Sequence, residues 1–475
     1  MNFRLRPALP RNESLKNLEA TPSGARLLRP RPSVGQLAVA LSWATAALAT
    51  AALVLPAEVA RAVDDHERPP ISYSQCTPDN CVSRLQARLD EGDLQWAHEE
   101  GFGYLRPLLD ALRVPVESQM LVFSKTSLQR DRISPRFPRA IYFNDEVYVG
   151  YCRSGEVLEI SAVDPQLGAV FYTLEQQPAD QPRLLRQTDN CLQCHSSART
   201  DGVPGHLVRS LFVDVGGQPM LSEGSYSVDH GTPLEHRWGG WYVTGTHGSQ
   251  SHLGNLIIQG KNVPRPVDNA PGHNVRRLPD RLAVENYLSP HSDIVALLVL
   301  EHQTLVHNRL TKANYTARQA LEYEREMNRA LGEPEANRLD STTRRMQGAA
   351  DDLVEALLLV GEAKLTAPIE GTSGYADRFA STGPRDQQGR SLRDFDLRRR
   401  LFKYPCSYLV YSPAFDALPP EMIACVWKRL WDVLNDPADV DSFAKLSKAD
   451  RRAVLEILRA TKPSLPKYWA GAGPR

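Results

Sequence analysis

The fold of this 475-residue chain is decided by the stretch Ala140-Ile-Tyr-Phe-Asn-Asp-Glu-Val-Tyr-Val-Gly150. Two short runs of β-branched and aromatic residues flank the turn-forming pair Asn144-Asp145, which is the pattern of a β-hairpin. The same pattern continues outward over residues 157–163 and 169–174, on either side of a turn at Asp164-Pro165. We therefore expect a β-meander in the first half of the chain.

Two weaker strand signals follow the meander. Residues 206–215 and 220–228 have the composition of a strand pair joined through Gly216-Gly217, and Trp241-Tyr-Val-Thr244 is a further short strand candidate. Glycine pairs between β-type runs are typical of hairpin turns. We expect this second group of strands to lie beside the meander.

The second half of the chain has the patterns of helices. Ser289-Pro290 supplies a cap and a first-turn proline, and apolar residues recur from there to Leu331, where Gly332 ends the helix. A second helix is expected from Asp340 to a point before Pro368. A third is expected over residues 447–460, where Ser447 precedes Asp450 by three residues, as in a capped helix start.

The five residues Cys191-Leu-Gln-Cys-His195 stand shortly after the meander. They form the pattern C-x-x-C-H, the attachment signature of c-type haem. Two thiols at this spacing can each add to one of the two vinyl groups on a porphyrin edge, and the adjacent histidine becomes the proximal iron ligand. The sequence therefore predicts one covalent haem c, held by Cys191 and Cys194 and ligated by His195.

Two other kinds of site use the same residue types. Cys191 and Cys194 could form a redox disulfide or supply half of a zinc site. A zinc site would need a second ligand pair of similar spacing, and the chain has no second C-x-x-C; Cys76 and Cys81 are separated by four residues. Those two cysteines, and likewise Cys406 and Cys425, are candidates for disulfides in an oxidising compartment.

A histidine is the expected sixth ligand of the iron. His302 is the first candidate, because its helical neighbours three and four residues away are all apolar and place it on a buried stripe; they are Leu298, Val299, Leu305 and Val306. A buried imidazole needs a partner, and iron is one; the alternative is a core histidine bonded to a carbonyl group. His307 lies about 140° around the same helix and cannot face the same iron.

His252 and His247 are the alternative sixth ligands. They lie in the loop Thr244-Gly-Thr-His-Gly-Ser-Gln-Ser-His252, whose glycines allow the backbone to approach a flat cofactor closely. Both could also bind a haem propionate or lie exposed. Arg209 and Arg237 are further candidates for pairing with a propionate.

The N-terminus has the pattern of an export signal. Residues 1–36 carry seven basic residues, and residues 37–55 then contain no charged residue. This length fits a long signal peptide or a single membrane span, with the basic flank on the cytoplasmic side. Ala60-Arg61-Ala62 resembles a cleavage site, which gives a mature start near Val63.

Two independent features thus indicate one compartment. Haem attached through C-x-x-C-H is normally assembled outside the cytoplasm, and the N-terminal signal directs the chain there. We expect the protein in a periplasm, or on the outer face of the cytoplasmic membrane if the N-terminal segment is retained as an anchor. Residues 63–475 contain 48 basic and 53 acidic residues, a net charge of −5, which argues against binding to nucleic acid.

The expected fold class is α+β, with the β-meander and the haem-binding segment in the first half and a mainly helical second half. Six segments are expected along the chain: a basic cytoplasmic leader (1–36), a signal peptide or membrane anchor (37–62), an N-terminal α/β region (63–180), a haem c-binding segment (181–260), a helical region (280–366) and a C-terminal helical region (367–475).

Three longer phrases resemble a group of large, uncharacterised bacterial monohaem cytochrome c domain proteins: residues 237–245 (Arg-Trp-Gly-Gly-Trp-Tyr-Val-Thr-Gly), residues 300–303 (Leu-Glu-His-Gln) with His307-Asn308, and residues 404–412 (Tyr-Pro-Cys-Ser-Tyr-Leu-Val-Tyr-Ser). The resemblance covers most of residues 63–475. It implies an exported, haem-binding protein. The only functional residues that it assigns are Cys191, Cys194 and His195.

The expected function is electron transfer through the covalent haem, with an unidentified redox partner protein. The alternatives are a haem-c-dependent oxidoreductase and a haem-based sensor, both with an open sixth iron position. A redox (electron-transfer) protein is expected rather than a dedicated catalyst. The sequence contains no nucleophile elbow, phosphate loop or H-E-x-x-H helix that would supply a catalytic site apart from the haem.

Overall fold

The computed structural model describes residues 65–279, 282–435, 443 and 445–471. Contacts divide the chain into a unit of residues 1–62 and a unit of residues 63–475, and the described residues all belong to the second unit. The expected leader and the expected signal or anchor lie outside the described residues. Within the described ranges, no helix combines the length and hydrophobicity that a membrane span requires.

A six-stranded antiparallel sheet forms the first half, and its strand order follows the sequence. The strands are β1 (Met120–Val122), β2 (Arg139–Phe143), β3 (Val147–Tyr151), β4 (Val157–Asp164), β5 (Gly168–Glu175) and β6 (Leu184–Gln187). Strands β2 to β5 are the predicted meander, which is confirmed. The short strands β1 and β6 extend it at its two edges and were not predicted.

The two faces of the sheet are covered by different elements. Tyr142, Val149, Ile160 and Tyr172 are paired neighbours on one face, which packs beneath the helices α2 (Cys81–Asp90) and α3 (Leu105–Ala111). Side chains alternate between faces along a strand, so Tyr148, Ser161 and Phe171 share the opposite face. On that face Tyr148 reaches the long helix α5 (Ile294–Leu331).

The second strand group is shorter than predicted. Strands β7 (Arg209–Leu211) and β8 (Ser225–Ser227) pair in antiparallel fashion, as expected for residues 206–215 and 220–228. The predicted strand at Trp241–Thr244 is wrong, because these residues make only isolated bridges. The Asn255 side chain bonds both the amide and the carbonyl group of Val243, so Val243 has no backbone group left for a strand ladder.

Helix α5 begins later than the sequence pattern predicted. Its cap is Asp293, whose carboxylate accepts hydrogen bonds from the amides of Val295 and Ala296. Ser289 does not cap the helix; its hydroxyl accepts from the His291 amide and forms a local turn. The predicted end is confirmed, because Gly332 follows Leu331 with a φ of 70°, a conformation that favours glycine.

The remaining long helices lie in the second half: α6 (Asp340–Leu357), α9 (Pro420–Asn435) and α10 (Lys448–Thr461). The predicted start of α6 is confirmed, and that of α10 is confirmed by a hydrogen bond from the Asp450 amide to the Ser447 hydroxyl. Helix α6 ends at Leu357, well before Pro368. Leu359 and Gly361, which follow the helix, adopt positive φ values. The shorter helices α7 (Tyr375–Ala380) and α8 (Pro413–Asp416) also contact α5.

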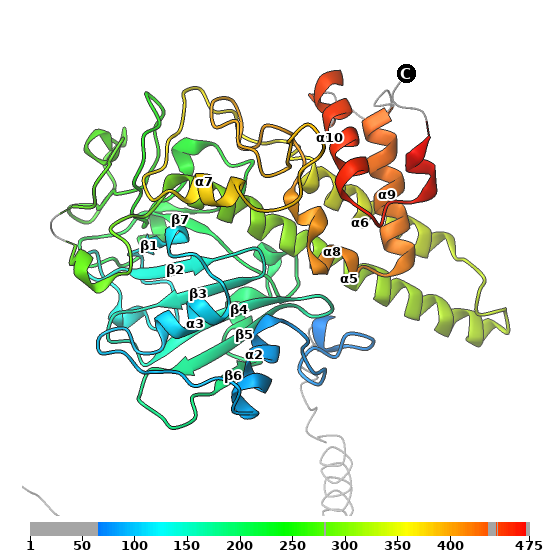
Figure 1. Ribbon diagram of the computed structural model, residues 1–475, viewed down its shortest axis with the longest axis horizontal. Coiled ribbons are helices and arrows are strands. Elements are labelled where there is room, and N and C mark those ends of the chain that lie inside the picture. Colours follow the sequence, from blue (N-terminus) through cyan, green and yellow to red (C-terminus); the bar gives the residue numbers. More distant parts are fainter. Residues whose placement is uncertain (1–64, 280–281, 436–442, 444, 472–475) are drawn as a thin grey trace, which may run out of the picture. The chain divides into compact units, whose positions relative to one another are not determined.

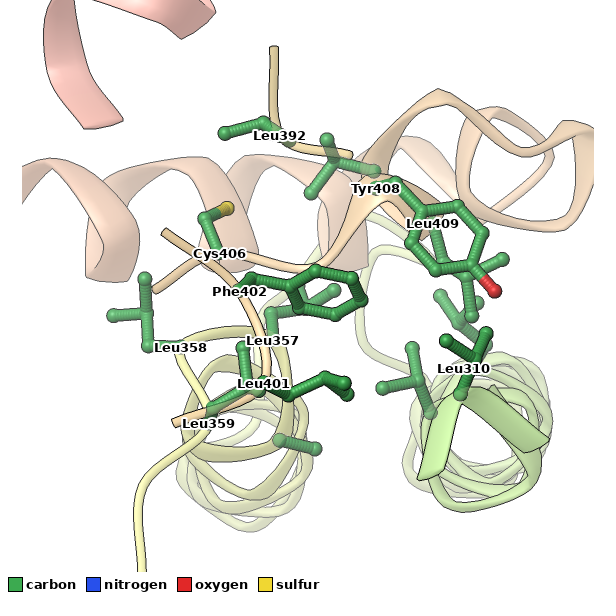
Figure 2. Packing of buried hydrophobic residues seen from close by; sticks show 14 of the residues in the cluster. Leu310, Leu357, Leu358, Leu359, Leu392, Leu401, Phe402, Cys406, Tyr408 and Leu409 are labelled. Atoms are coloured by element: carbon green, nitrogen blue, oxygen red, sulfur yellow. The ribbon is translucent and has the colours of Figure 1, made fainter. Parts of the chain in front are cut away.

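The core of the second half is built around α5 and α6. Figure 2 shows Phe402 and Tyr408 over these two helices, near Leu310 of α5 and Leu357 of α6. Phe402 and Tyr408 belong to segments without long helices, yet both are buried. The fold is therefore α+β, with a six-stranded antiparallel sheet in the first half and a mostly helical second half, and α5 contacts elements of both halves (Figure 1).

Candidate functional site

The C-x-x-C-H residues lie directly after the edge strand β6, on the single-turn helix α4 (Leu192–His195). Leu192 is buried in the cluster that covers the sheet, and this anchors the turn. Cys191 packs partly buried against the same cluster, whereas Cys194 is exposed. The structure therefore holds one thiol against the protein and presents the other to solvent, three residues along the chain.

His195 is oriented by the backbone. Its Nδ1 lies 3.0 Å from the carbonyl oxygen of Gly205, and its ring centre lies 4.9 Å from that of Phe171 on β5. Burial lowers the pKa of His195, and the Gly205 carbonyl opposes this shift. Nδ1 therefore carries the proton that Gly205 accepts, and Nε2 has the free lone pair with which a neutral imidazole binds a metal ion.

The cysteines are unpaired. All seven are free thiols in the structure, so neither Cys191–Cys194 nor the suggested pairs Cys76–Cys81 and Cys406–Cys425 form disulfides. Burial, followed by the negative charge of Glu159, raises the pKa of Cys191 to about 11. The Cys191 thiol is therefore protonated at neutral pH when no metal or cofactor is bound. Among the described residues, no group of three or more His, Cys, Asp or Glu side chains is arranged around a metal position.

Basic residues lie near the motif. Arg139 and Glu159 form an ion pair of 2.7 Å on the sheet face next to the motif, and their charges act on both Cys191 and His195. Burial, and then the charge of Arg199, lower the pKa of Arg209, while Cys194 raises it. Arg209 is thus close to both Cys194 and Arg199, and it could pair with an anionic group near Cys194. Arg237 is not, because it is buried against Glu301 at 2.6 Å.

The structure does not bring His302 to the motif. His302 is buried, as predicted, but its Nδ1 lies 3.0 Å from His230 Nδ1 and its Nε2 lies 2.8 Å from the Ser407 hydroxyl. His230 Nε2 faces the Val360 carbonyl and carries a proton, so His302 must donate from Nδ1. The lone pair on His302 Nε2 therefore accepts the Ser407 proton. Both nitrogens are engaged, as in a core histidine.

The structure brings His247 and His252 to each other rather than to His195. Their ring centres lie 4.6 Å apart, and each lies within 5.3 Å of the His273 ring. His247 Nε2 accepts from the Asn274 amide, and His252 Nδ1 accepts from the Gly254 amide. For all three predicted histidines, ligation of an iron at His195 would require existing hydrogen bonds to break. Their assignment as sixth ligands stays a prediction.

A chain of aromatic residues leads away from the motif on the α5 side of the sheet. The Phe171 ring lies between His195 and His206, with centre distances of 4.9 and 6.5 Å. His206 packs 4.2 Å from Tyr148, whose hydroxyl lies 2.9 Å from His307 Nδ1. His206 and His307 each retain one buried nitrogen without a hydrogen bond among the described residues.

The sequence shows His206 and His307 as separate residues and does not predict that both lie beside Tyr148. Strand alternation places Phe171 and Tyr148 on one face of the sheet, and that much was open to prediction. The approach of α5 to that face was not, because Tyr148 and His307 are 159 residues apart.

No family model, no curated protein and no solved structure matches this chain. The C-x-x-C-H residues and their surroundings are therefore the features of this chain that bear on its function.

Proposed function

We propose that this protein is an exported monohaem c-type cytochrome whose main role is electron transfer to or from a redox partner protein. The observation that carries the proposal is the C-x-x-C-H motif, together with the hydrogen bond between His195 Nδ1 and the Gly205 carbonyl. The resemblance to large bacterial monohaem proteins supports the same assignment. The proposed cellular location is the periplasm, or the outer face of the cytoplasmic membrane if an N-terminal anchor is retained.

The residues present fit a covalent haem. Cys191 and Cys194 are free thiols, and the exposure of Cys194 allows a porphyrin edge to approach from solvent. His195 is partly buried, and its Nε2 makes no hydrogen bond with any described residue. When bound, the haem would supply a one-electron couple at its iron.

The chain's own groups have distinct roles in this proposal. Cys191 and Cys194 would hold the porphyrin, and His195 would ligate the iron with its orientation set by Gly205, since such second bonds fix the ring and strengthen the ligand. Arg209 and Arg199 would balance the negative propionates. The exposed side of the motif at Cys194 is where a partner protein could approach.

Covalent attachment gives the first prediction. When the protein is produced with a c-type maturation system, a denaturing gel stained for haem should show a coloured band from the periplasmic or membrane fraction. Cys191→Ala or Cys194→Ala should leave weakly held haem and a much fainter band, and the double variant none. Cys425→Ala, which removes a partly buried thiol on α9, is the control and should stain like the wild type. A mature protein without a haem adduct in its mass would exclude the proposal.

A second candidate function is a haem-c-dependent oxidoreductase or sensor. It is favoured by the engagement of both nitrogens of His302 with His230 and Ser407, and by the separate cluster of His247 and His252. If no protein group fills the sixth position, an external ligand can bind there. Electron transfer requires only a change of oxidation state, whereas catalysis and sensing require such an open position.

The sixth position gives the second prediction. If this second function holds, the reduced wild-type protein should bind carbon monoxide, and His302→Gln should give the same spectra as the wild type both before and after carbon monoxide is added. The opposite result would be a low-spin wild type that ignores carbon monoxide and binds it only after His302→Gln. That result would restore His302 as the ligand and favour a pure electron carrier. A switch caused only by His252→Gln or His247→Gln would assign the loop instead.

A further inference from the structure

A cavity of about 430 Å³ lies where the sheet, α5 and α8 meet. Its wall includes Asp145 and Glu146 from the β2–β3 turn, His307 from α5, Asp79 and Arg84 at the start of α2, and residues of α8 such as Asp416. The volume lies within the range of about 300 to 1,000 Å³ that is usual for small-molecule sites.

The cavity is acidic, and three of its four carboxylates are already neutralised. Asp79 pairs with Arg84 at 2.5 Å, Asp416 pairs with Lys462 at 2.6 Å, and Asp145 pairs with Arg393. Glu146 makes no hydrogen bond or ion pair through its side chain within the described part of the chain. Burial, and then the charge of Asp145, raise the pKa of Glu146, while Arg84 lowers it. Glu146 is therefore the one cavity carboxylate without a direct partner in that part of the chain.

His307 supplies a second unpartnered group, and its protonation follows from its neighbours. The amide of Gln303 donates to the Asn144 carbonyl and to the Tyr148 oxygen, and its own oxygen accepts from Tyr408. Tyr148 must therefore donate its proton to His307 Nδ1, which lies 2.9 Å away. Nε2 then carries the remaining ring proton.

This N–H group is buried, and no described residue accepts from it in good hydrogen-bond geometry, although the Asp145 carbonyl interacts with the ring. The Asp145 carbonyl favours protonation of His307, but burial is the larger effect and lowers the pKa to about 3. The ring is therefore neutral at physiological pH. A buried donor without a well-placed partner is costly to the fold, so a ligand that accepts from it would gain affinity.

We propose that this cavity binds a small amino alcohol, whose ammonium group pairs with Glu146 and whose hydroxyl oxygen accepts from His307 Nε2. The carboxylate and the N–H donor are complementary to a cation and an acceptor, respectively. An anionic ligand is disfavoured by the four acidic side chains on the wall. Arg84, Arg393 and Lys462 are each held by a carboxylate of their own.

The site is linked by contacts to the C-x-x-C-H residues. His307 bonds Tyr148, Tyr148 packs on His206, and Phe171 lies between His206 and His195. Binding of the amino alcohol does not itself depend on haem. Cys191→Ala protein should therefore bind it as the wild type does, so failure of the haem proposal and failure of this inference are distinguishable.

The test uses linear amino alcohols from ethanolamine to 5-aminopentan-1-ol, titrated into the protein by calorimetry. Alkylamines of equal length lack the hydroxyl group, and hydroxy acids lack the ammonium group. We expect one site for the best amino alcohol, an alkylamine affinity lower by about fivefold or more, and no binding of the hydroxy acid. Glu146→Gln should reduce affinity by about tenfold or more, because a charge-assisted bond is lost.

Two controls keep the outcome interpretable. Glu175→Gln removes an exposed carboxylate at the end of β5 and should leave affinity unchanged. The His307 ring resonances of wild-type protein should shift on titration, which provides a readout that needs no variant. The proposal would be overturned if no saturable binding is found. It would also be overturned if binding occurs but neither Glu146→Gln nor His307→Gln changes it and the His307 resonances do not shift.

Discussion

At the scale of single residues, burial sets the protonation of the histidines. His307 and His230 are almost completely buried, and burial lowers their pKa values to about 3 and about 4. In an unfolded chain a histidine has a pKa of about 6.5. Between these values the unfolded state binds more protons than the folded state, so each group's contribution to stability is present above pH 6.5 and is lost as the pH falls.

His307→Gln should reveal this effect directly. At pH 7.5 the variant should be less stable than the wild type, because the bond to Tyr148 is changed. At pH 5 the difference in unfolding free energy should be smaller by about 2 kcal/mol, since the wild type alone must keep this imidazole unprotonated on folding. Urea unfolding at pH 7.5, 6.5 and 5 would measure it. A difference that is constant across this range would contradict the assignment of a depressed His307 pKa.

At the scale of elements, the start of α5 depends on a single carboxylate that serves two segments. Asp293 is fully buried, and while one of its oxygens caps α5, the other accepts from the amides of Thr372 and Ser373. The exposed Ser447 caps α10 by a single bond from the Asp450 amide. Four backbone amides therefore depend on Asp293, whereas one depends on Ser447.

Asp293→Ala should therefore cost more than an ordinary cap. We expect a loss of about 2 to 4 kcal/mol of unfolding free energy, from the helix cap and the unsatisfied amides of the 372–373 segment. Ser447→Ala should cost about 1 kcal/mol. Equal losses in urea unfolding would show that the 372–373 segment finds other partners when the carboxylate is removed.

At the scale of the whole molecule, the sheet and α5 meet at a close contact. Gly168, the first residue of β5, has a φ of 73°, and a Cβ there would lie 2.3 Å from Thr311 of α5 and 2.8 Å from the Pro204 carbonyl. Pro204 precedes Gly205, which orients His195. The start of β5, the helix and the segment behind the motif are thus packed without space for a methyl group.

Gly168→Ala tests this contact against a matched glycine. Gly332 has a φ of 70° at the end of α5, and a Cβ added there would meet nothing within 4 Å beyond its own chain neighbours. Gly332→Ala should cost about 1 kcal/mol from backbone strain alone. Gly168→Ala should cost about 2 to 4 kcal/mol, because overpacking adds to the strain. Similar thermal stability of the two variants would show that Thr311 can move aside.

Much of the fold could be predicted because its signals are local. Strands β2 to β5 and the helix ends at Gly332 and Ser447 depend on residues only a few positions apart. The edge strands β1 and β6 are three and four residues long and have little pattern of their own. The predicted start of α5 is wrong because Ser289-Pro290 also satisfies the rule for a helix start, and only the fold shows that Asp293 takes that role.

The sequence by itself determined the C-x-x-C-H residues, the meander before them and the burial of His302, since each is encoded by spacing along one short segment. Only the tertiary structure decided that His302 bonds His230 and Ser407, that Gly205 orients His195, and that Glu146 and His307 share a cavity. The physical reason is that hydrogen bonding depends on which groups the packed elements bring within about 3 Å. Most of these partners are tens to more than a hundred residues apart along the chain, where no local pattern relates them.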